Sequence, residues 1–451
     1  MNVDTAVVLA AGEGKRLRPL TKNRPKPMLP VANRPILEYV LDELVDAGLR
    51  ELHLVVGYKR DRVREYFGST YREASITYHI QHKQLGSGHA LLQARSGIDS
   101  DFLVVNGDQL VSREIIADVL DAHTVEDVAT LGVMESERIA QYGAVTLSND
   151  HVTQITERPQ PDTHGLLNAG VYVFAPSVFA EIEAIPRQQG ELSLPGAIEA
   201  LIEAGKPVRG VRTVGFWRDA TFPWDLLSLS EELLAHGHVT DADTERDIPT
   251  SESSDGHSRT TTVAIDDEAQ IHETAVVRAP VVIGADCSVG ANAVVGPNVA
   301  LGRNGAVEAG AAIRNSVIDQ DSRIEMNATL IDAVTGQAVV IGPGTIIPGG
   351  RSDIPVGERV YQNERLGAVV GDRAELEGGC TVDAGTLIGP NVRAAVGCSI
   401  MKNRQSTAGH RARGRLPAVR SRTGRRSAVN RRCRALFSDP GSAACYETIH
   451  W

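Results

Sequence analysis

Aromatic residues, lysine and cysteine are scarce in this chain of 451 residues. Only 4% of the residues are aromatic, and seven lysines stand against 39 arginines. All five cysteines lie at or beyond Cys287 without a Cys-x-x-Cys pair, so the sequence indicates neither a disulfide framework nor a zinc site. Near the N-terminus, no apolar run is long enough for a signal peptide or a membrane span. We therefore expect a cytoplasmic protein with no membrane partner.

Acidic residues are in excess, but they are unevenly distributed. The formal net charge of the chain is −11, whereas residues 1–403 alone carry 35 basic and 55 acidic side chains, a net of −20. An acid-rich, lysine-poor surface suits solubility in high salt, where self-repulsion is screened, so we hypothesise a salt-loving host. Residues 404–451 contain eleven arginines, yet they lack the interleaved aromatics typical of nucleic-acid binding. We predict no nucleic-acid partner.

Residues 1–232 alternate between strand-like and helix-like patterns. Helical periodicity is clearest over residues 35–47, where six aliphatic residues fall on one side. Seven short apolar runs predict strands: Thr5–Ala10, Glu51–Val56, Ile76–Ile80, Phe102–Asn106, Val128–Val133, Gly170–Phe174 and Val208–Val211. This alternation predicts an α/β domain with a Rossmann-like, mainly parallel mixed sheet. Ligands of such sheets bind beyond the carboxyl ends of the strands.

Two segments show no regular pattern. Residues 233–262 are polar and acidic, which predicts a linker, and we expect no metal site from its histidines, His236, His238 and His257. Residues 401–451 differ abruptly in composition from the chain before them. We predict that this arginine-rich tail is disordered or arises from a reading-frame shift.

Between these segments, residues 263–400 follow a period of six. Aliphatic residues recur six apart before an interruption between residues 319 and 369, which retains Ile341-Gly-Pro-Gly-Thr-Ile, and again six apart after it; a further coil fades at Ala394. The repeated positions are Ile265, Ile271, Val277, Ile283, Val289, Val295, Leu301, Val307 and Ile313, then Val370, Leu376, Val382 and Ile388. Three short strands per coil, with every sixth residue pointing inward, define a hexapeptide-repeat prism. The pattern resembles the left-handed parallel β-helix, an exception to the usual right-handed crossover.

The most distinctive motif runs from Leu9 to Lys26, directly after the first predicted strand. Glycines at positions 12 and 14 allow a sharp turn and leave backbone N–H groups free to approach an anion. Arg16 and Lys26 add positive charge where a polyphosphate would lie. The spacing fits neither the mononucleotide P-loop nor Gly-x-Gly-x-x-Gly. It resembles the signature of sugar-1-phosphate nucleotidyltransferases, which implies nucleotide contacts from Leu9, Ala10, Ala11, Gly12 and Gly14.

A carboxylate follows the apolar strand that ends in Asn-Gly, at the edge where the sheet would face its ligand. This carboxylate is Asp108, and a hard oxygen donor there suits Mg²⁺ bridging phosphate oxygens. The later segment Phe-Trp-Arg-Asp219 resembles the family's Trp-x-Asp, which implies that Asp219 is the second metal ligand. In uracil-specific bacterial relatives an asparagine takes this position, so Asp219 leans towards the thymidylyl or general sugar-transferase pattern.

Residues 81–89, Gln-His-Lys-Gln-Leu-Gly-Ser-Gly-His, resemble the base-recognition loop of the UDP-N-acetylglucosamine pyrophosphorylase branch of this family. The resemblance implies that Gln81 reads the uracil edge and that backbone groups of Gly86 and Ser87 complete the contact. A side-chain amide offers both a donor and an acceptor, which suits uracil. We expect His89 to pack or cap rather than to catalyse.

Further segments resemble the family's sugar-binding motifs. The resemblance implies a backbone contact from Gly143, hydroxyl contacts from Glu157, and contacts from Asn168 to the hydroxyl or N-acetyl region. Many relatives have lysine after that glutamate, whereas this chain has Arg158, which keeps the charge but changes its reach. The full set of implied sugar contacts is Asn106, Gly107, Gly143, Glu157, Arg158 and Asn168.

Together these motifs predict Mg²⁺-dependent nucleotidyl transfer from UTP or dTTP to a sugar-1-phosphate, with N-acetylglucosamine-1-phosphate or glucose-1-phosphate as the best candidates. The attacking phosphate oxygen is already anionic, so the reaction needs positioning and charge neutralisation rather than a general base. We predict Arg16, Lys26 and Asp108 as the catalytic residues. One alternative is a glucose-1-phosphate thymidylyl- or uridylyltransferase whose β-helix serves only oligomerisation. Another is a non-catalytic nucleotide-sugar sensor resembling translation-factor subunits, which tend to lose the arginine and lysine of the loop.

The two-domain layout resembles bifunctional pyrophosphorylases that also acetylate glucosamine-1-phosphate, with acetyl-CoA as a second cofactor. In the bacterial form the base lies in an Asn-His-x-Gly-type segment, and this chain has none. His272 is the only histidine, and Lys402 the only lysine, between residues 262 and 403. A histidine base would suit amine deprotonation near neutral pH. We therefore predict weak or absent acetyl transfer, and a homotrimer assembled through the β-helix.

Overall fold

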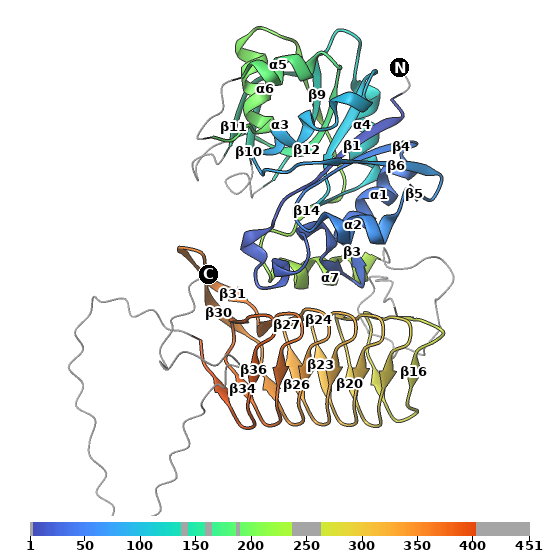
Figure 1. Cartoon of the computed structure of the whole chain (residues 1–451), viewed down its shortest axis with the longest axis vertical. Coiled ribbons are helices and arrows are strands. Elements are labelled where there is room, and N and C mark those ends of the chain that lie inside the picture. The colour runs from blue at the N-terminus through green and yellow to red at the C-terminus, as the bar shows by residue number, and fades with distance from the viewer. Residues whose placement is uncertain (1–2, 137–142, 158–164, 186–189, 237–262, 403–451) are drawn as a thin grey trace, which may run out of the picture.

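The computed structural model describes residues 3–136, 143–157, 165–185, 190–236 and 263–402. An N-terminal α/β domain is followed by a C-terminal β-helix, and helix α7 (Asp225–His236) lies between them (Figure 1). The predicted fold class is confirmed. Helix α7 continues four residues beyond the predicted domain end at residue 232, because its apolar side packs on the β-helix. The linker after His236, with His238 and His257, and the tail after Lys402 lie outside the described residues.

One ten-stranded sheet organises the α/β domain, in the order β10-β11-β13-β9-β12-β7-β1-β4-β6-β5. Its strands are β1 (Thr5–Ala10), β4 (Glu51–Val56), β5 (Thr70–Tyr71), β6 (Ala74–Ile80), β7 (Phe102–Asn106), β9 (Ala129–Met134), β10 (Gly143–Ser148), β11 (His151–Glu157), β12 (Leu166–Phe174) and β13 (Val208–Arg212). The neighbouring strands β7, β1, β4 and β6 are parallel, as the alternating pattern predicts. The other half is mixed, because β12 pairs antiparallel with both β7 and β9.

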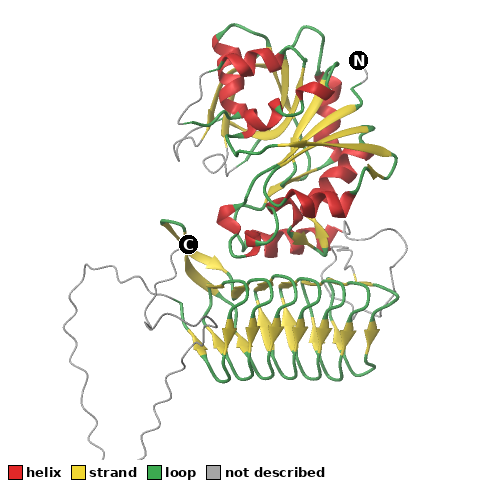
Figure 2. Ribbon diagram, viewed as in Figure 1, coloured by secondary structure: helices red, strands yellow, loops and turns green. Residues whose placement is uncertain are grey.

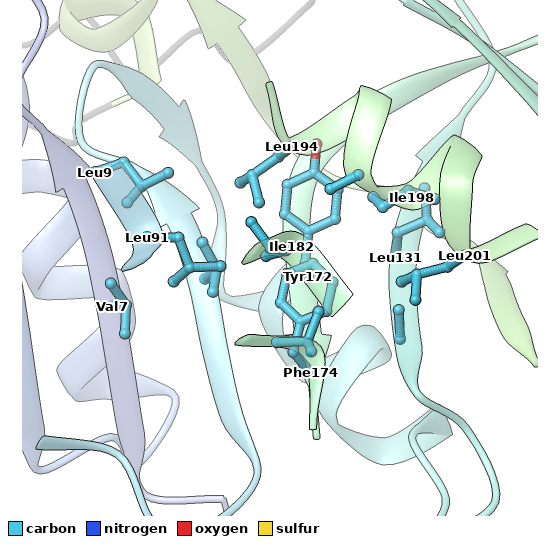
Figure 3. Close-up of a cluster of buried hydrophobic side chains, with 14 of the residues drawn as sticks. Val7, Leu9, Leu91, Leu131, Tyr172, Phe174, Ile182, Leu194, Ile198 and Leu201 are labelled. Atoms are coloured by element: carbon cyan, nitrogen blue, oxygen red, sulfur yellow. The ribbon is translucent and has the colours of Figure 1, made fainter. Parts of the chain in front are cut away.

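Helices cover both faces of this sheet. They are α1 (Ile36–Asp46), α2 (Arg60–Phe67), α3 (Ser87–Leu92), α4 (Arg113–Ala122), α5 (Val178–Ala184) and α6 (Leu194–Glu203), with a short 3₁₀ turn η4 (Arg95–Gly97). Successive side chains of β1 point to opposite faces. Val7 and Leu9 therefore join the apolar cluster beneath α3, α5 and α6, which Figure 3 shows around Tyr172. Ala6 and Val8 join the cluster beneath α1 and α4, so β1 is buried on both sides. The helices within the described ranges are all too short or too polar to span a membrane.

The β-helix has seven coils, and each coil adds one strand to each of three parallel sheets (Figure 2). The first sheet contains β15 (Val263–Ile265), β18 (Val281–Ile283), β21 (Val299–Leu301), β24 (Ser316–Ile318), β27 (Ala333–Thr335), β32 (Ala368–Val370) and β35 (Thr386–Ile388). The second contains β16 (Gln270–Ile271), β19 (Ser288–Val289), β22 (Ala306–Val307), β25 (Arg323–Ile324), β28 (Val340–Ile341), β33 (Glu375–Leu376) and β36 (Arg393–Ala394). The third contains β17 (Val276–Val277), β20 (Val294–Val295), β23 (Ala312–Arg314), β26 (Thr329–Ile331), β29 (Ile346–Ile347), β34 (Thr381–Val382) and β37 (Ser399–Ile400). Inward side chains of all three sheets form one apolar cluster.

The coils continue through residues 319–369, so the predicted interruption is wrong for most of this stretch. Paired residues are 18 positions apart at Val281 and Val299 but 17 apart at Val317 and Val334, and each shorter coil shifts the six-residue register by one. The insertion itself is a hairpin of β30 (Arg351–Val356) and β31 (Arg359–Arg365). The last coil does not fade at Ala394 either, because β37 completes it.

The first sheet of the β-helix is apolar on both sides, because the α/β domain covers its outer face. The middle residues of its strands join α7 and the segment after the glycine-rich loop in one buried cluster. That segment contains η1 (Lys15–Leu17), η2 (Leu20–Lys22), η3 (Lys26–Met28), β2 (Pro30–Val31) and β3 (Arg34–Pro35). The β-helix contributes Ala264, Val282, Ala300, Val317, Val334 and Val369, and the α/β domain contributes Leu17, Leu20, Leu29, Leu226, Leu229 and Leu233 among others. The two domains therefore share a continuous apolar core.

Candidate active site

The glycine-rich loop leaves the carboxyl end of β1 and returns against Lys26. Gly14 has a φ of +66°, in the left-handed region that favours glycine. A Cβ atom there would lie 2.8 Å from the Cβ of Lys26, so glycine is needed for this close approach. The hydroxyl of Thr21 donates to the Gly14 carbonyl at 2.8 Å and holds the turn. Gly12 is exposed, and an added Cβ would meet nothing within 4 Å, so the loop is open on that side.

Lys26 lies between two carboxylates. Its Nζ is 2.8 Å from Asp108 Oδ2 and 2.6 Å from Asp219 Oδ1. Only 11% of the lysine side chain is exposed. Burial alone would lower the pKa of Lys26, but the charges and hydrogen bonds of the two carboxylates outweigh it and raise the pKa above its ordinary value. Lys26 is therefore a fixed cation at neutral pH.

A two-stranded sheet brings the two carboxylates together. β8 (Gln109–Val111) pairs antiparallel with β14 (Trp217–Asp219), and the register places Asp219 opposite Gln109, the neighbour of Asp108. β8 follows β7 at the edge of the large sheet where ligands of parallel strands bind. The structure therefore brings together Lys26, Asp108 and Asp219, which belong to three separate motifs in the sequence.

A turn that begins helix α7 holds Asp219 from its other side. The hydroxyl of Thr221 donates to Asp219 Oδ2 at 2.5 Å. The backbone N–H groups of Thr221 and Phe222 donate to Asp225 Oδ2 at 2.9 and 2.7 Å. Burial raises the pKa of Asp225 to about 6, although these two hydrogen bonds act to lower it. Thr221 and Asp225 were not among the predicted site residues, and their only signal in the sequence is their place just after the Trp-x-Asp motif.

Gln81 is buried at the end of β6, with 4% of the residue exposed. Its Nε2 donates to the Gly86 carbonyl at 3.1 Å and lies 2.9 Å from Nδ1 of His89. The amide nitrogen therefore shapes the loop that the sequence assigned to base recognition. His89 packs against Gln81, in agreement with the expectation of a packing role. The contact of Gln81 with a base stays a prediction.

The same loop is anchored on both sides. Gly86 has a φ of +97°, and an added Cβ would lie 2.3 Å from the carbonyl oxygen of Leu192. The N–H of Leu194 donates to Ser87 Oγ at 2.9 Å. Gln84, which the sequence analysis missed, donates from Nε2 to the Ala11 carbonyl at 2.9 Å. This bond joins the base loop to the glycine-rich loop, directly beyond Leu9 and Ala10.

Gly143, Glu157 and Asn168 come from three strands at one end of the sheet. The register places Gly143 of β10 opposite Glu157 of β11. A Cβ at position 143 would lie 3.9 Å from the Cβ of Asn168 in β12. Asn168 donates from Nδ2 to the hydroxyl of Tyr172 at 2.8 Å, which fixes its amide. Arg158 lies outside the described residues.

Asn106 ends β7 beside β1, and Gly107 follows it. The N–H of Gly107 donates to the Leu9 carbonyl at 3.0 Å, and Asn106 Nδ2 donates to Gln109 Oε1 at 2.9 Å. Gly170 has a φ of +71°, and an added Cβ would lie 2.5 Å from Gln109 Oε1. Glycine therefore allows β12 to approach this point closely, which places the predicted sugar residues beside the predicted metal ligands.

Arg16 is a predicted catalytic residue that the structure does not bring into this cluster. Its side chain is exposed and forms no hydrogen bond or ion pair with any described residue. Its neighbours Lys15 and Arg18 both pair with Glu13 instead. A contact between Arg16 and phosphate stays a prediction.

Asp108 and Asp219 fit the donor set of Mg²⁺. Both are hard oxygen donors, and both converge on one cation, the Lys26 ammonium. Mg²⁺ is commonly held by one or two carboxylates and completes its shell with phosphate oxygens and water. Among the described residues, no group of three or more His, Cys, Asp or Glu could hold a metal. A metal at this place would therefore take its other ligands from bound phosphate and water.

The comparison with protein families identifies the class. The family described as nucleotidyl transferase matches residues 5–236, just over half of the chain. The chain therefore belongs to the nucleotidyl transferase family.

Particular relatives match the same half of the chain. The bifunctional protein GlmU of Methanococcus maripaludis (strain C5) is 38% identical over 233 residues, which are 51% of this chain and 54% of that protein. The UTP–glucose-1-phosphate uridylyltransferase AglF of Haloferax volcanii is 37% identical over 227 residues, 49% of this chain and 92% of that protein. A solved UDP-glucose pyrophosphorylase complexed with UDP-glucose is 21% identical, with a TM-score of 0.47, over 51% of this chain and 98% of its own. The chain spans about half the length of the GlmU proteins that it matches.

The position of Lys26 predicts the effect of removing its charge. Lys26→Met keeps the volume of the stem but leaves two facing carboxylates without a cation. We expect kcat for pyrophosphate release to fall by about 10²–10³-fold, because a preorganised charge is lost from the phosphates. We also expect Mg²⁺ to raise the melting temperature more in this variant than in the wild type, since the ion no longer competes with the ammonium. Lys206→Met, in a surface pair with Glu181, is the matched control. Near wild-type turnover in Lys26→Met would refute this assignment.

Gln81→Ala tests the base loop. We expect it to weaken the use of UTP and dTTP by roughly 1–3 kcal/mol, measured as kcat/KM, because buried hydrogen bonds are lost. His82→Ala, exposed at the next position, should leave kcat/KM unchanged. If the wild type uses ATP or GTP at a measurable rate, an equal loss of kcat/KM with that purine triphosphate would show that Gln81 only maintains the loop and does not select the base.

Proposed function

We propose that this protein is a Mg²⁺-dependent sugar-1-phosphate nucleotidyltransferase that uses UTP or dTTP and releases pyrophosphate. The observation that carries the proposal is Lys26, fixed between Asp108 and Asp219 beside an open glycine-rich loop. Such a cluster offers one permanent cation and two metal-binding carboxylates at the edge of the sheet where ligands bind. These groups could bind the triphosphate and the sugar phosphate next to each other by neutralising their negative charge.

The residues act by position and charge. The backbone of Gly12 to Gly14 and the exposed Arg16 would hold the β- and γ-phosphates, and Lys26 would bridge the α-phosphate and the sugar phosphate. Mg²⁺, when bound by Asp108 and Asp219, supplies further neutralisation of the crowded phosphate charge. The sugar phosphate oxygen attacks the α-phosphorus in line, the bond to the β-phosphate oxygen breaks, and pyrophosphate leaves. No proton has to be removed from the nucleophile, so the site needs no general base.

Lys26 must exchange partners during this cycle. In the ligand-free protein its ammonium pairs with both carboxylates and offsets one of their two negative charges. In the reaction the carboxylates would face the metal and the ammonium would face phosphate. Each charged group would therefore have a partner of opposite sign in both states. This exchange supports an enzyme over a nucleotide-sugar sensor, because a sensor does not need a lysine ammonium that moves from the carboxylates to a phosphate group.

The sugar and the base are proposed from the residues around this cluster. Asn168, with its neighbours Gly143 and Glu157, offers amide and carboxylate groups that suit sugar hydroxyls or an N-acetyl group. We propose N-acetylglucosamine-1-phosphate or glucose-1-phosphate as the acceptor. The AglF relative is named for UTP and glucose-1-phosphate, which supports glucose-1-phosphate as the acceptor and UTP as the donor.

The β-helix supports a structural role better than acetyl transfer. His272 is exposed at the first coil, where its Nδ1 lies 3.0 Å from the hydroxyl of Thr274. A base for acetyl transfer would need a pocket for the amine, and no other histidine lies in residues 263–402. We therefore propose weak or absent acetyl transfer from acetyl-CoA.

The third sheet of the β-helix supports a homotrimer. Arg314 is the one charged residue among its outward positions, whereas those of the second sheet include Arg323, Glu375 and Arg393. The outward residues of the third sheet are Val276, Val294, Ala312, Arg314, Thr329, Ile331, Ile346, Thr381 and Ser399. Two of the larger ones, Val276 and Ile346, are 43% and 44% exposed in the single chain. We propose that this face packs against further copies of the chain.

One substrate panel tests the function. UTP, dTTP, ATP and GTP are each offered with glucose-, glucosamine- and N-acetylglucosamine-1-phosphate, and pyrophosphate is measured with Mg²⁺ and with EDTA. We expect release only with a pyrimidine triphosphate, an accepted sugar phosphate and Mg²⁺. The same protein with acetyl-CoA and glucosamine-1-phosphate should release little or no thiol. The absence of pyrophosphate from every pair would refute the enzyme, and robust thiol release would refute the structural role of the β-helix.

Ile346→Glu tests the trimer. A charge on β29, the fifth of the seven strands of the third sheet, would be buried without a partner in the assembly, so we expect the variant to become monomeric. Light scattering coupled to size-exclusion chromatography gives the mass. Arg323→Glu on the second sheet, where 60% of the side chain is exposed, should remain trimeric. A monomeric wild-type protein would contradict the proposal.

A further inference from the structure

We propose that Asp319 and Asp372 of the β-helix are positioning residues for nucleotidyl transfer, because they hold Arg24 and through it the segment that carries Lys26. This inference rests on the proposed function and assigns a part of the same site to the second domain. The β-helix would complete the site from outside the α/β domain.

A buried ionic triad joins the Lys26 segment to the β-helix. Arg24 Nη1 lies 2.5 Å from Asp319 Oδ2, and Arg24 Nη2 donates to Asp372 Oδ1 at 2.9 Å. The side chains of Arg24, Asp319 and Asp372 are only 6%, 8% and 3% exposed. Asn23 donates from Nδ2 to Asp372 Oδ2 at 2.9 Å. One aspartate of the β-helix therefore binds two successive residues of the α/β domain.

The chain between Arg24 and Lys26 is stiff. Pro25 separates the two residues and Pro27 follows Lys26, and each proline ring restricts its own φ to a narrow range. Beyond this stretch, Leu29 is buried in the cluster shared by the two domains. A displacement of Arg24 would therefore move Lys26 as well, because the backbone between them has little freedom to absorb it.

The β-helix is shaped to receive this contact. Asp319 directly follows β24 and Asp372 lies two residues beyond β32, while the coil between them has Gly336 at the same corner. A Cβ atom at position 336 would lie 2.2 Å from Asp372 Oδ1, so glycine leaves room for the carboxylate. The N–H of Gln337 donates to that same oxygen at 3.0 Å and fixes its direction.

Burying the charges of this triad costs desolvation free energy, so the triad is not the most stable way to join two apolar surfaces. Burial raises the pKa of Asp319 even though Arg24 acts to lower it, and the pair of carboxylates shares one guanidinium. Buried ion pairs can often be replaced by apolar side chains of similar volume without loss of stability. The surrounding interface is already apolar. A defined direction for the Lys26 segment is a property that apolar packing alone would not supply.

A second contact supports the opposite side of the site. The ring of Tyr361, in the inserted hairpin, lies 4.3 Å from that of Phe222 and 5.6 Å from that of Trp224, measured between centroids. Phe222 belongs to the turn whose Thr221 holds Asp219. The β-helix therefore contacts both the Lys26 segment and the Asp219 turn.

The test compares full-length variants. Arg24→Met/Asp319→Leu/Asp372→Asn removes the triad's charges, keeps similar volumes and retains an acceptor for Gln337, so we expect a melting temperature near that of the wild type. We expect kcat for pyrophosphate release to fall by about 10-fold or more with little change in KM for the triphosphate, since misplacing a reacting group by about 1 Å can cost ~100-fold. Val282→Ala removes apolar packing from the same interface, two strands away from β24. It should lower the melting temperature without this loss of kcat.

The outcomes separate the inference from the function on which it rests. A folded triple variant with wild-type kcat would overturn the inference and leave the proposed function intact. An equal loss of kcat in Val282→Ala would also overturn it, because general loosening of the interface would then explain the effect. A wild-type protein that releases no pyrophosphate with any substrate pair would instead remove the proposed function. If the triple variant does not fold, Asp372→Asn alone decides by the same comparison of kcat with KM.

Discussion

The ammonium of Lys26 between Asp108 and Asp219 is the interaction on which the rest of the structure depends. A cation shared by two carboxylates attracts both of them, which favours the meeting of the three segments that carry these charges. Lys26 belongs to a loop that starts from the doubly buried β1, Asp108 follows β7, and Asp219 ends the short strand β14. The turn after β14 begins α7, which packs on the β-helix. Charge balance at the site and apolar packing between the domains therefore constrain the same residues.

The three faces of the β-helix differ because each has a different neighbour. The first sheet is apolar on its outer face and covered by the α/β domain, whereas the second carries charges and faces solvent. The third carries a single charged side chain, that of Arg314, and its strands have no neighbouring domain in the single chain. A prism with one repeated inner pattern can therefore serve two different contacts, because only the outward positions need to change. The inward residues of the coils determine the fold of the β-helix. The outward residues determine which surfaces pack against it.

Local patterns in the sequence predicted most of the helices and strands. They could not predict contacts between segments that lie far apart in the sequence. Alternating apolar segments indicated the strands of the sheet, and the period of six indicated the β-helix, because both periods reflect which side chains are buried. Coils of 17 residues hid this period between residues 319 and 369, since one missing residue shifts every later position. Lys26, Asp108 and Asp219 were visible as motifs, but their meeting follows from the pairing of β8 with β14. Arg24 gave no signal, because its partners lie in another domain and a buried arginine looks like a surface arginine in the sequence.

The separation of 348 residues between Arg24 and Asp372 has a consequence for the order in which the protein is made. Chains emerge from the ribosome N-terminus first, and domains generally fold as units. The α/β domain would therefore be complete while Arg24 still lacks both carboxylates. Each coil of a β-helix contacts only its neighbours, so Asp319 would arrive first and Asp372 two coils later. The loop that carries Lys26 would then reach its final position only after the sixth coil of the β-helix has formed.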